Sequence, residues 1–249
     1  MRRSVLVPLF LFIVPGMVAP NTYAYAAKIK YAYVFIDRFP EEAGPLGFST
    51  GNVLHLGAFI VPGDSPITEV TAKNLDTGSL LTLTRIDLGP IFTDLVYEAQ
   101  PCPHFDPSTH KGVWEIGVRD ENGKEVFAKT HNLDKGGKLP YVQNIKASGS
   151  PFAPKITWTT LKKEDYPSEC QIKYRVRLLK NNRNQFYKTK ELSPDTKDEI
   201  PGGFLKYEDI PDTYIRIETQ CWDTDDKDHP VGIELKSETF LPFVEAFSQ

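Results

Sequence analysis

The chain has 249 residues, of which 40% are hydrophobic and 25% are charged, and its formal net charge is −4. This length is enough for one large or two ordinary domains with well-formed cores. A slightly acidic chain has no general electrostatic affinity for nucleic acid or for anionic lipid, so we exclude both as general partners.

The first residues have the pattern of a secretory signal peptide. Arg2 and Arg3 precede the apolar stretch VLVPLFLFIV (residues 5–14), and Ala24-Tyr25-Ala26 is a small-x-small cleavage site. The pattern predicts that residues 1–26 are removed and that the mature chain is periplasmic or extracellular. An uncleaved membrane anchor is the alternative, but the apolar core is shorter than the roughly 20 residues that a spanning helix needs. We expect no transmembrane segment in the mature chain.

From residue 28 onward, apolar side chains recur at every second position, which is the period of a β-strand. The clearest runs are NVLHLGAFIV (52–61), VWEIGV (113–118), VFAKTH (126–131), PKITW (154–158), CQIKYRVRLL (170–179) and YIRIETQC (214–221). Asn122-Gly123 favours a hairpin turn before the third of these runs, because both residues tolerate positive φ. The sequence therefore predicts an all-β chain.

Side chains of one kind alternate along two of the predicted strands. Tyr31, Tyr33 and Phe35 alternate along the first mature strand and either stack against sugars or fill a sandwich face. Lys173, Arg175 and Arg177 alternate along a later strand. We interpret this basic row as a solvated sheet face.

The segment NLDKGGKLP (132–140) has the composition of a linker between two domains. It is polar, contains Gly136-Gly137 and ends at Pro140. It separates residues 27–131 from residues 141–241, and each part has the size of one immunoglobulin-type sandwich. One continuous sandwich or barrel is the alternative.

Residues 141–241 resemble a fibronectin type III domain. The residues that carry the resemblance are Trp158 in KITW, Tyr174 and Val176 in YRV, and the segment IPDTYIRIET (210–219). The tyrosine-corner position of that family falls on Thr213. Residues 27–131 are more loosely similar to an immunoglobulin domain, mainly through the terminal hairpin GVWEIGVRDENGKEV (112–126). The resemblance implies two tandem β-sandwiches and leaves the activity open.

The same resemblance implies a disulfide between Cys170 and Cys221. In the fibronectin-like arrangement, Cys170 begins the third strand and Cys221 ends the sixth, and these strands are antiparallel neighbours. Alternation along both strands places the two thiols on the core face. The bond would contribute roughly 4 kcal/mol by the chain-entropy argument. Two buried free thiols are the alternative.

The loop PCPHFDPSTH (101–110) concentrates residue types that bind transition metals. Cys102, His104, Asp106 and His110 would be the ligands of zinc or copper. Their spacing matches none of the well-attested zinc patterns, and three prolines stiffen the segment. A rigid loop with an exposed thiol is therefore the alternative.

The loop DTDDKDH (223–229) offers Asp223, Asp225, Asp226 and Asp228 to a calcium ion. The glycine of an EF-hand loop is absent and Lys227 occupies the third ligand position, so the alternative is a solvated loop between strands.

The tail PFVEAFSQ (242–249) leaves apolar side chains beyond the last predicted strand. We predict that Phe243, Val244 and Phe247 contact a partner protein. The alternative is a tail that folds back onto its own domain.

These features together predict an exported, non-catalytic protein that acts in binding, adhesion or envelope assembly, with a protein or a surface component as its partner. The motif GFSTG (47–51) is followed by a strand, so it is a turn rather than a nucleophile elbow. The first alternative is a metal-dependent enzyme or metal carrier that uses residues 102–110. The second is a pilus-type periplasmic chaperone, although the paired basic anchoring residues of that family are not identified here. No cofactor is assigned apart from the zinc, copper or calcium of the two loops.

Overall fold

The computed structural model describes residues 25–87, 94–133, 139–167, 170–180, 185–188, 194–223 and 233–248. Almost all of the predicted signal peptide lies outside these residues. The described chain is predominantly β, as the alternation predicts, and its longest helical segment is the six-residue η3 (Tyr207–Asp212). No helix in these ranges is long and apolar enough to span a membrane.

Strands β1 to β7 form an N-terminal unit with the strand order β1-β2-β5-β4-β3-β6-β7. The bounds are β1 (Lys28–Phe39), β2 (Gly51–Val61), β3 (Ile67–Asn74), β4 (Leu80–Ile86), β5 (Leu95–Ala99), β6 (Gly112–Asp120) and β7 (Glu125–Leu133), with the short helices η1 (Glu41–Ala43) and α1 (Pro107–His110). Strand β7 lies against β1, so the sheet curves round on itself and its apolar face lies inside. Leu54, Leu56, Ala58 and Ile60 are fully buried on that face, as their alternation predicts.

The predicted hairpin joins β6 to β7, but its turn differs from the expected one. Only Gly123 has a positive φ, 77°, whereas Asn122 does not. The carboxylate of Asp120 instead accepts hydrogen bonds from the backbone N–H groups of Asn122 and Lys124. These two hydrogen bonds to the Asp120 side chain stabilise the turn, so Asn122 does not need the left-handed conformation that was expected.

Strands β8 to β14 form a C-terminal unit of two sheets. One sheet has the order β12-β9-β8, and the other has the order β11-β10-β13-β14. The bounds are β8 (Gln143–Ser150), β9 (Ala153–Thr159), β10 (Cys170–Lys180), β11 (Gln185–Lys188), β12 (Lys197–Glu199), β13 (Thr213–Asp223) and β14 (Ile233–Pro242), with η2 (Lys163–Asp165) and α2 (Phe243–Ala246). The ring of Trp158 on β9 meets that of Tyr174 on β10 edge-on, at 5.5 Å between centroids.

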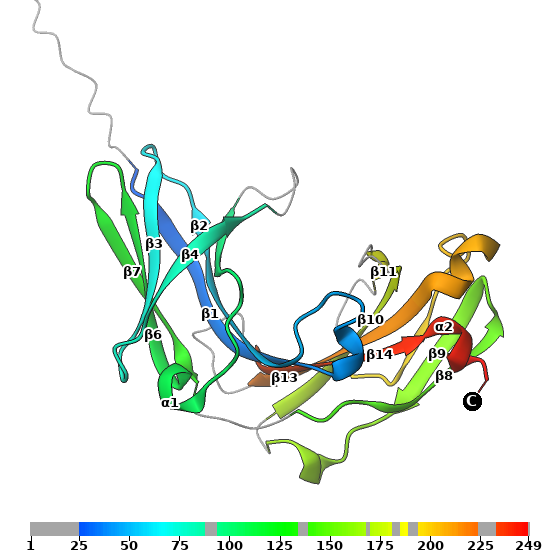
Figure 1. Ribbon diagram of the computed structural model, residues 1–249. Coiled ribbons are helices and arrows are strands. Elements are labelled where there is room, and N and C mark those ends of the chain that lie inside the picture. Colours follow the sequence, from blue (N-terminus) through cyan, green and yellow to red (C-terminus); the bar gives the residue numbers. More distant parts are fainter. Residues whose placement is uncertain are drawn as a thin grey trace, which may run out of the picture.

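A parallel pairing of β1 with β14 joins the two units into one 11-stranded sheet. In Figure 1 the units lie at an angle, and β1 runs from the N-terminal unit down to this junction. The tandem arrangement expected from the sequence included no shared sheet. The end of the predicted linker is also tied to β14, because the Ser237 hydroxyl donates a 2.8 Å hydrogen bond to the carbonyl of Pro140.

The disulfide between Cys170 and Cys221 is present, as predicted. Strands β10 and β13 pair antiparallel, with Ile172 opposite Cys221. Both sulfur atoms lie in the apolar core, so the bond covalently links two central strands of the C-terminal unit.

Thr213, which the sequence resemblance assigned to the corner position, takes part in a hydrogen bond. Its hydroxyl is buried and donates to the carbonyl of Asp209 at 2.7 Å. We expect Thr213→Val to lower the free energy of unfolding by about 1 kcal/mol, because the carbonyl loses its donor. Thr213→Ser, which keeps the hydroxyl, should retain most of the stability. Urea denaturation measures both, and equal stability of the valine variant and the wild type would contradict the role of this bond.

Candidate functional site

A layer of charged side chains, together with one glutamine, covers the outward face of the shared sheet at the junction. Because successive strand residues point to opposite faces, Ile36 enters the core while Asp37 points outward, opposite Lys236 of β14. The layer consists of Asp37 on β1, Lys236 and Glu238 on β14, Arg216, Glu218 and Gln220 on β13, and Arg175 and Arg177 on β10. The Arg216 guanidinium also lies 5.1 Å from the ring of Phe48, which covers part of the layer.

These charges are paired in a continuous network. The Lys236 ammonium lies 2.9 Å from Asp37 Oδ2 and 2.6 Å from Glu238 Oε1. Arg216 binds Glu238 with two hydrogen bonds of 2.7 and 2.5 Å. Burial opposes ionisation of Glu218, but the charges of Lys236 and the neighbouring arginines outweigh it and lower the pKa of Glu218.

The basic row predicted as a solvated face belongs to this network, so that interpretation is wrong for two of its three members. Arg177 donates two hydrogen bonds to Glu218, at 2.9 and 2.6 Å. Arg175 lies 3.9 Å from the same carboxylate. Lys173 is placed over the ring of Trp222, 4.4 Å from its centroid. Pairing across β10 and β13, which no single-strand pattern reveals, covers most of the surface of both arginines.

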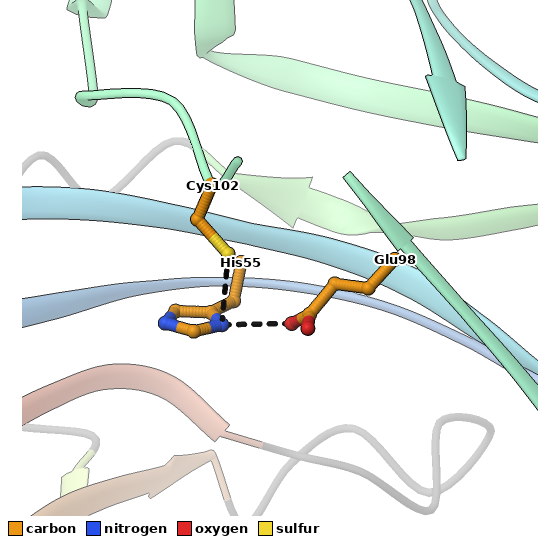
Figure 2. A group of neighbouring side chains, drawn as sticks. All are labelled: His55, Glu98 and Cys102. Atoms are coloured by element: carbon orange, nitrogen blue, oxygen red, sulfur yellow. Dashed lines mark hydrogen bonds and ion pairs between the residues drawn. The ribbon is translucent and has the colours of Figure 1, made fainter. Parts of the chain in front are cut away.

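At the β1–β2 side of the charged layer, His55, Glu98 and Cys102 converge (Figure 2). His55 is on β2, Glu98 is on β5, and Cys102 lies in the loop that follows β5. Glu98 Oε1 is 2.7 Å and Cys102 Sγ is 3.8 Å from the same ring nitrogen, His55 Nδ1. The Phe35 ring stacks on the imidazole at 4.8 Å, with 7° between the planes, which fixes the ring orientation.

Neighbouring polar groups hold the acid and the thiol in place. The Gln100 side-chain amide donates to Glu98 Oε2 at 3.1 Å and to Cys102 Sγ at 3.5 Å. The buried Tyr33 hydroxyl interacts with Glu98, and burial together with this negative charge raises the pKa of Tyr33. Gly57 makes room for that hydroxyl, because a Cβ atom there would lie only 2.6 Å from it.

The other side of the imidazole faces a buried carboxylate. Asp37 Oδ2 lies 3.8 Å from His55 Nε2. Within the described ranges, Asp37 Oδ1 and His55 Nε2 are both buried without a hydrogen-bond partner. Burial raises the pKa of Asp37, while the charges of Lys236 and His55 act in the opposite direction. Unsatisfied atoms on two facing side chains mark a strained or functional position.

We expect the His55 imidazole to stay protonated far above the ordinary pH range of histidine. Burial lowers its pKa, but hydrogen bonds with Cys102 and Glu98 and the charge of Asp37 outweigh burial and raise the pKa to about 9. An ordinary histidine titrates near about 6.5. NMR titration of the ring protons, in protein kept in a chelator, should give a midpoint near 9.

The raised pKa of His55 makes the stability of the fold depend on pH. A group whose folded pKa is raised stabilises the fold fully below its unfolded pKa, and this contribution is lost as the pH rises through the folded value. The wild type should therefore lose stability toward about pH 9, and His55→Gln should lose less over the same interval. A ring midpoint near that of an ordinary histidine would contradict the assignment.

The structure does not bring the predicted ligands of the 101–110 loop together. Among the described residues, Cys102 groups with His55 and Glu98 instead of His104 and His110. His104 forms a β-bridge with Val53 at the edge of β2. His110 Nδ1 accepts a hydrogen bond from the backbone N–H of Asp106, and Asp106 caps α1. The geometry of His110 and Asp106 is thus that of a structured loop.

The predicted calcium loop lies mostly outside the described residues, whereas almost all of the tail lies within them. Asp225, Asp226 and Asp228 of the predicted calcium loop lie outside the described residues, as does the side chain of Asp223. In the tail, Phe243 is the first residue of α2, and its side chain is fully buried in the core. It is therefore not available to a partner, which corrects the prediction for this residue. Val244 and Phe247 are partly exposed.

Two hollows meet at Tyr141, where both units contribute residues. One, of about 670 Å³, is lined by Arg38, Asn52 and His104, and the other, of about 590 Å³, by Tyr214, Pro242 and Glu245. They share Pro40, Glu42 and Tyr141. We call the two hollows together the junction groove. The Arg38 guanidinium stacks on the Tyr141 ring at 4.3 Å and donates to the Leu139 carbonyl at 3.4 Å.

Sequence reasoning missed Asp37, His55 and Glu98, which are far apart in the chain. The only signal was a polar residue on an otherwise apolar strand, as in NVLHLGAFIV (52–61). No family model matches the chain, and the search of curated proteins found no match to it. The functional interpretation therefore depends on the residues of the junction themselves.

Proposed function

We propose that the protein is an exported, non-catalytic binding protein that holds an extended segment of a partner protein in the junction groove. The observation that carries the proposal is that residues of both units line this groove. The shared sheet and the paired charges beside it join the units without a flexible hinge at β1 and β14. A groove between rigidly joined units is preformed, which lowers the entropy cost of binding.

The lining of the groove indicates the chemistry of the partner. Tyr141, Tyr214, Pro40 and Pro242 offer flat apolar surfaces, on which the rings of an extended proline-containing peptide pack. Glu42 and Glu245 line the same hollow and complement a lysine or arginine of the peptide. The proposed ligand is therefore a proline-containing segment that carries a basic residue.

The geometry around Cys102 supports a binding role over nucleophilic catalysis. A thiol activated by histidine needs a ring nitrogen to itself, with the orienting acid on the other nitrogen. Here Glu98, at 2.7 Å, occupies the nitrogen that Cys102 approaches at 3.8 Å. The carboxylate has the stronger contact, so the imidazole is not free to take the thiol proton.

Fluorescence polarisation with two labelled peptides tests the proposal. The probe is a proline-rich peptide with arginine residues, and the matched peptide has glutamate in place of each arginine. We expect the arginine peptide to bind more tightly, and we expect Tyr141→Ala to weaken its binding at least about tenfold, as for an aromatic anchor. Tyr207→Ala, at an exposed residue of η3 away from the groove, is the control.

Two results would overturn the proposal. One is equal binding of the arginine and glutamate peptides, because Glu42 and Glu245 would then have no role in binding. The other is wild-type affinity of the Tyr141→Ala variant with its fold intact by circular dichroism.

A further inference from the structure

We infer that His55, Glu98 and Cys102 form a binding site for one zinc(II) ion, at the junction but separate from the groove. The three residues bring an imidazole nitrogen, a carboxylate oxygen and a sulfur within 4.8 Å of one another. This mixed set of donors is one that zinc accepts, whereas copper(I) prefers sulfur ligands and magnesium or calcium prefer oxygen alone.

The distances are close to those of a tetrahedral site. Zinc lies about 2.0–2.3 Å from such ligands, so two of them are separated by about 3.3–3.7 Å. Cys102 Sγ is 3.8 Å from His55 Nδ1, just beyond this separation, so only a small adjustment of the thiol is needed. Glu98 Oε1 is 2.7 Å from the same nitrogen. A small side-chain rotation of Glu98 exchanges this hydrogen bond for a bond to the ion.

An independent observation points to the same site. Asp37 is only 1% exposed, its Oδ1 has no partner within the described structure, and its Oδ2 faces His55 Nε2 at 3.8 Å. When a histidine binds a metal through one ring nitrogen, the other nitrogen usually donates to a carboxylate. Asp37 faces Nε2 and can accept that bond once Nδ1 holds zinc, which would give the unsatisfied histidine nitrogen a partner.

A neighbouring amide orients two of the ligands, and the site is open to solvent. The Gln100 amide donates to both Glu98 Oε2 and Cys102 Sγ, so one side chain orients two ligands. The His55 side chain is 21% exposed and Cys102 is partly exposed, so an ion can reach the site from solvent. Binding replaces the proton on the Cys102 thiol and the proton on His55 Nδ1 with bonds to the metal, and both protons pass to solvent.

Titration of the full-length mature chain with cobalt(II), a spectroscopic substitute for zinc, tests the inference. We expect one equivalent to bind and to give the charge-transfer absorption of a cobalt–thiolate bond. Cys102→Ser should abolish this absorption, and His55→Gln and Glu98→Gln should weaken binding at least about tenfold. Asp37→Asn, which also removes a charge that faces Lys236, should weaken binding by about 10- to 100-fold in protein that circular dichroism shows to be folded.

His104→Gln and His110→Gln are the matched controls, because they lie in the same loop but outside the cluster, and both should bind cobalt as the wild type does. A second measurement needs no variant: zinc should slow the alkylation of Cys102 by iodoacetamide in the wild type. Absence of the thiolate absorption in the folded wild type would overturn the inference. So would loss of binding in His110→Gln, or unchanged alkylation of Cys102 at saturating zinc.

Discussion

Replacement of Lys236 by methionine is expected to lower the free energy of unfolding by about 3–5 kcal/mol. Lys236 is the cation next to Asp37 and also contacts Glu238, and its side chain is only 11% exposed. Methionine has a similar length but no charge, so the variant leaves the Asp37 carboxylate buried without its cation. Equilibrium denaturation in urea at neutral pH measures the loss.

The loss in Lys236→Met should shrink at lower pH. Without the cation, burial raises the pKa of Asp37 further above its unfolded value, so ionisation of Asp37 destabilises the variant as the pH rises. Arg119→Met is the matched control, because Arg119 forms ion pairs with Glu69 and Glu125 at a side chain that is 51% exposed. Exposed pairs contribute about 1 kcal/mol or less. Equal losses in the two variants would contradict the importance of the buried network.

Replacement of Phe243 by alanine is also expected to cost about 3–5 kcal/mol, the range for removal of a large buried side chain. Phe243 begins α2, is fully buried and belongs to the main core cluster. Thermal unfolding should therefore show a much lower melting temperature. Deletion of residues 242–249 should have an effect at least as large, because it removes the same side chain.

Val244→Ala tests the same helix one residue further on. Val244 is 45% exposed, so the substitution should change the stability by no more than about 0.5 kcal/mol. A melting temperature of Phe243→Ala close to that of Val244→Ala would show that α2 does not pack as described. The contribution of Val244 and Phe247 to a partner contact stays a prediction, and the same alanine variants serve to measure it.

The strands could be predicted from the sequence because each carries its own pattern. Apolar residues at alternate positions, as at Leu54 and Leu56, place one face in a core wherever the strand lies. The disulfide followed from the same alternation, combined with the likeness to a known domain. Phe243 was placed outside the fold because a short helix of one turn has no periodic pattern long enough to recognise.

The junction could not be predicted, because it depends on pairing between distant segments. Strand β1 pairs with β14 across almost the whole length of the chain, and parallel pairing leaves no turn signal. For the same reason, sequence reasoning singled out Cys102 as a candidate metal ligand but sought the other ligands within the same loop. Loop neighbours are close in sequence, but His110 accepts a hydrogen bond from Asp106 and His104 pairs with β2. The residues near the thiol come from β2 and β5.

X-ray absorption spectroscopy of the zinc-loaded protein reports the atoms bound to the metal, and so shows whether zinc binds to Cys102 at the junction. With one zinc per chain, the account predicts one sulfur at about 2.3 Å and the remaining ligands as nitrogen or oxygen at about 2.0–2.2 Å. The sulfur should be absent in Cys102→Ser, since the other two cysteines form a disulfide. A first shell of nitrogen and oxygen alone in the wild type would contradict the site formed by His55, Glu98 and Cys102.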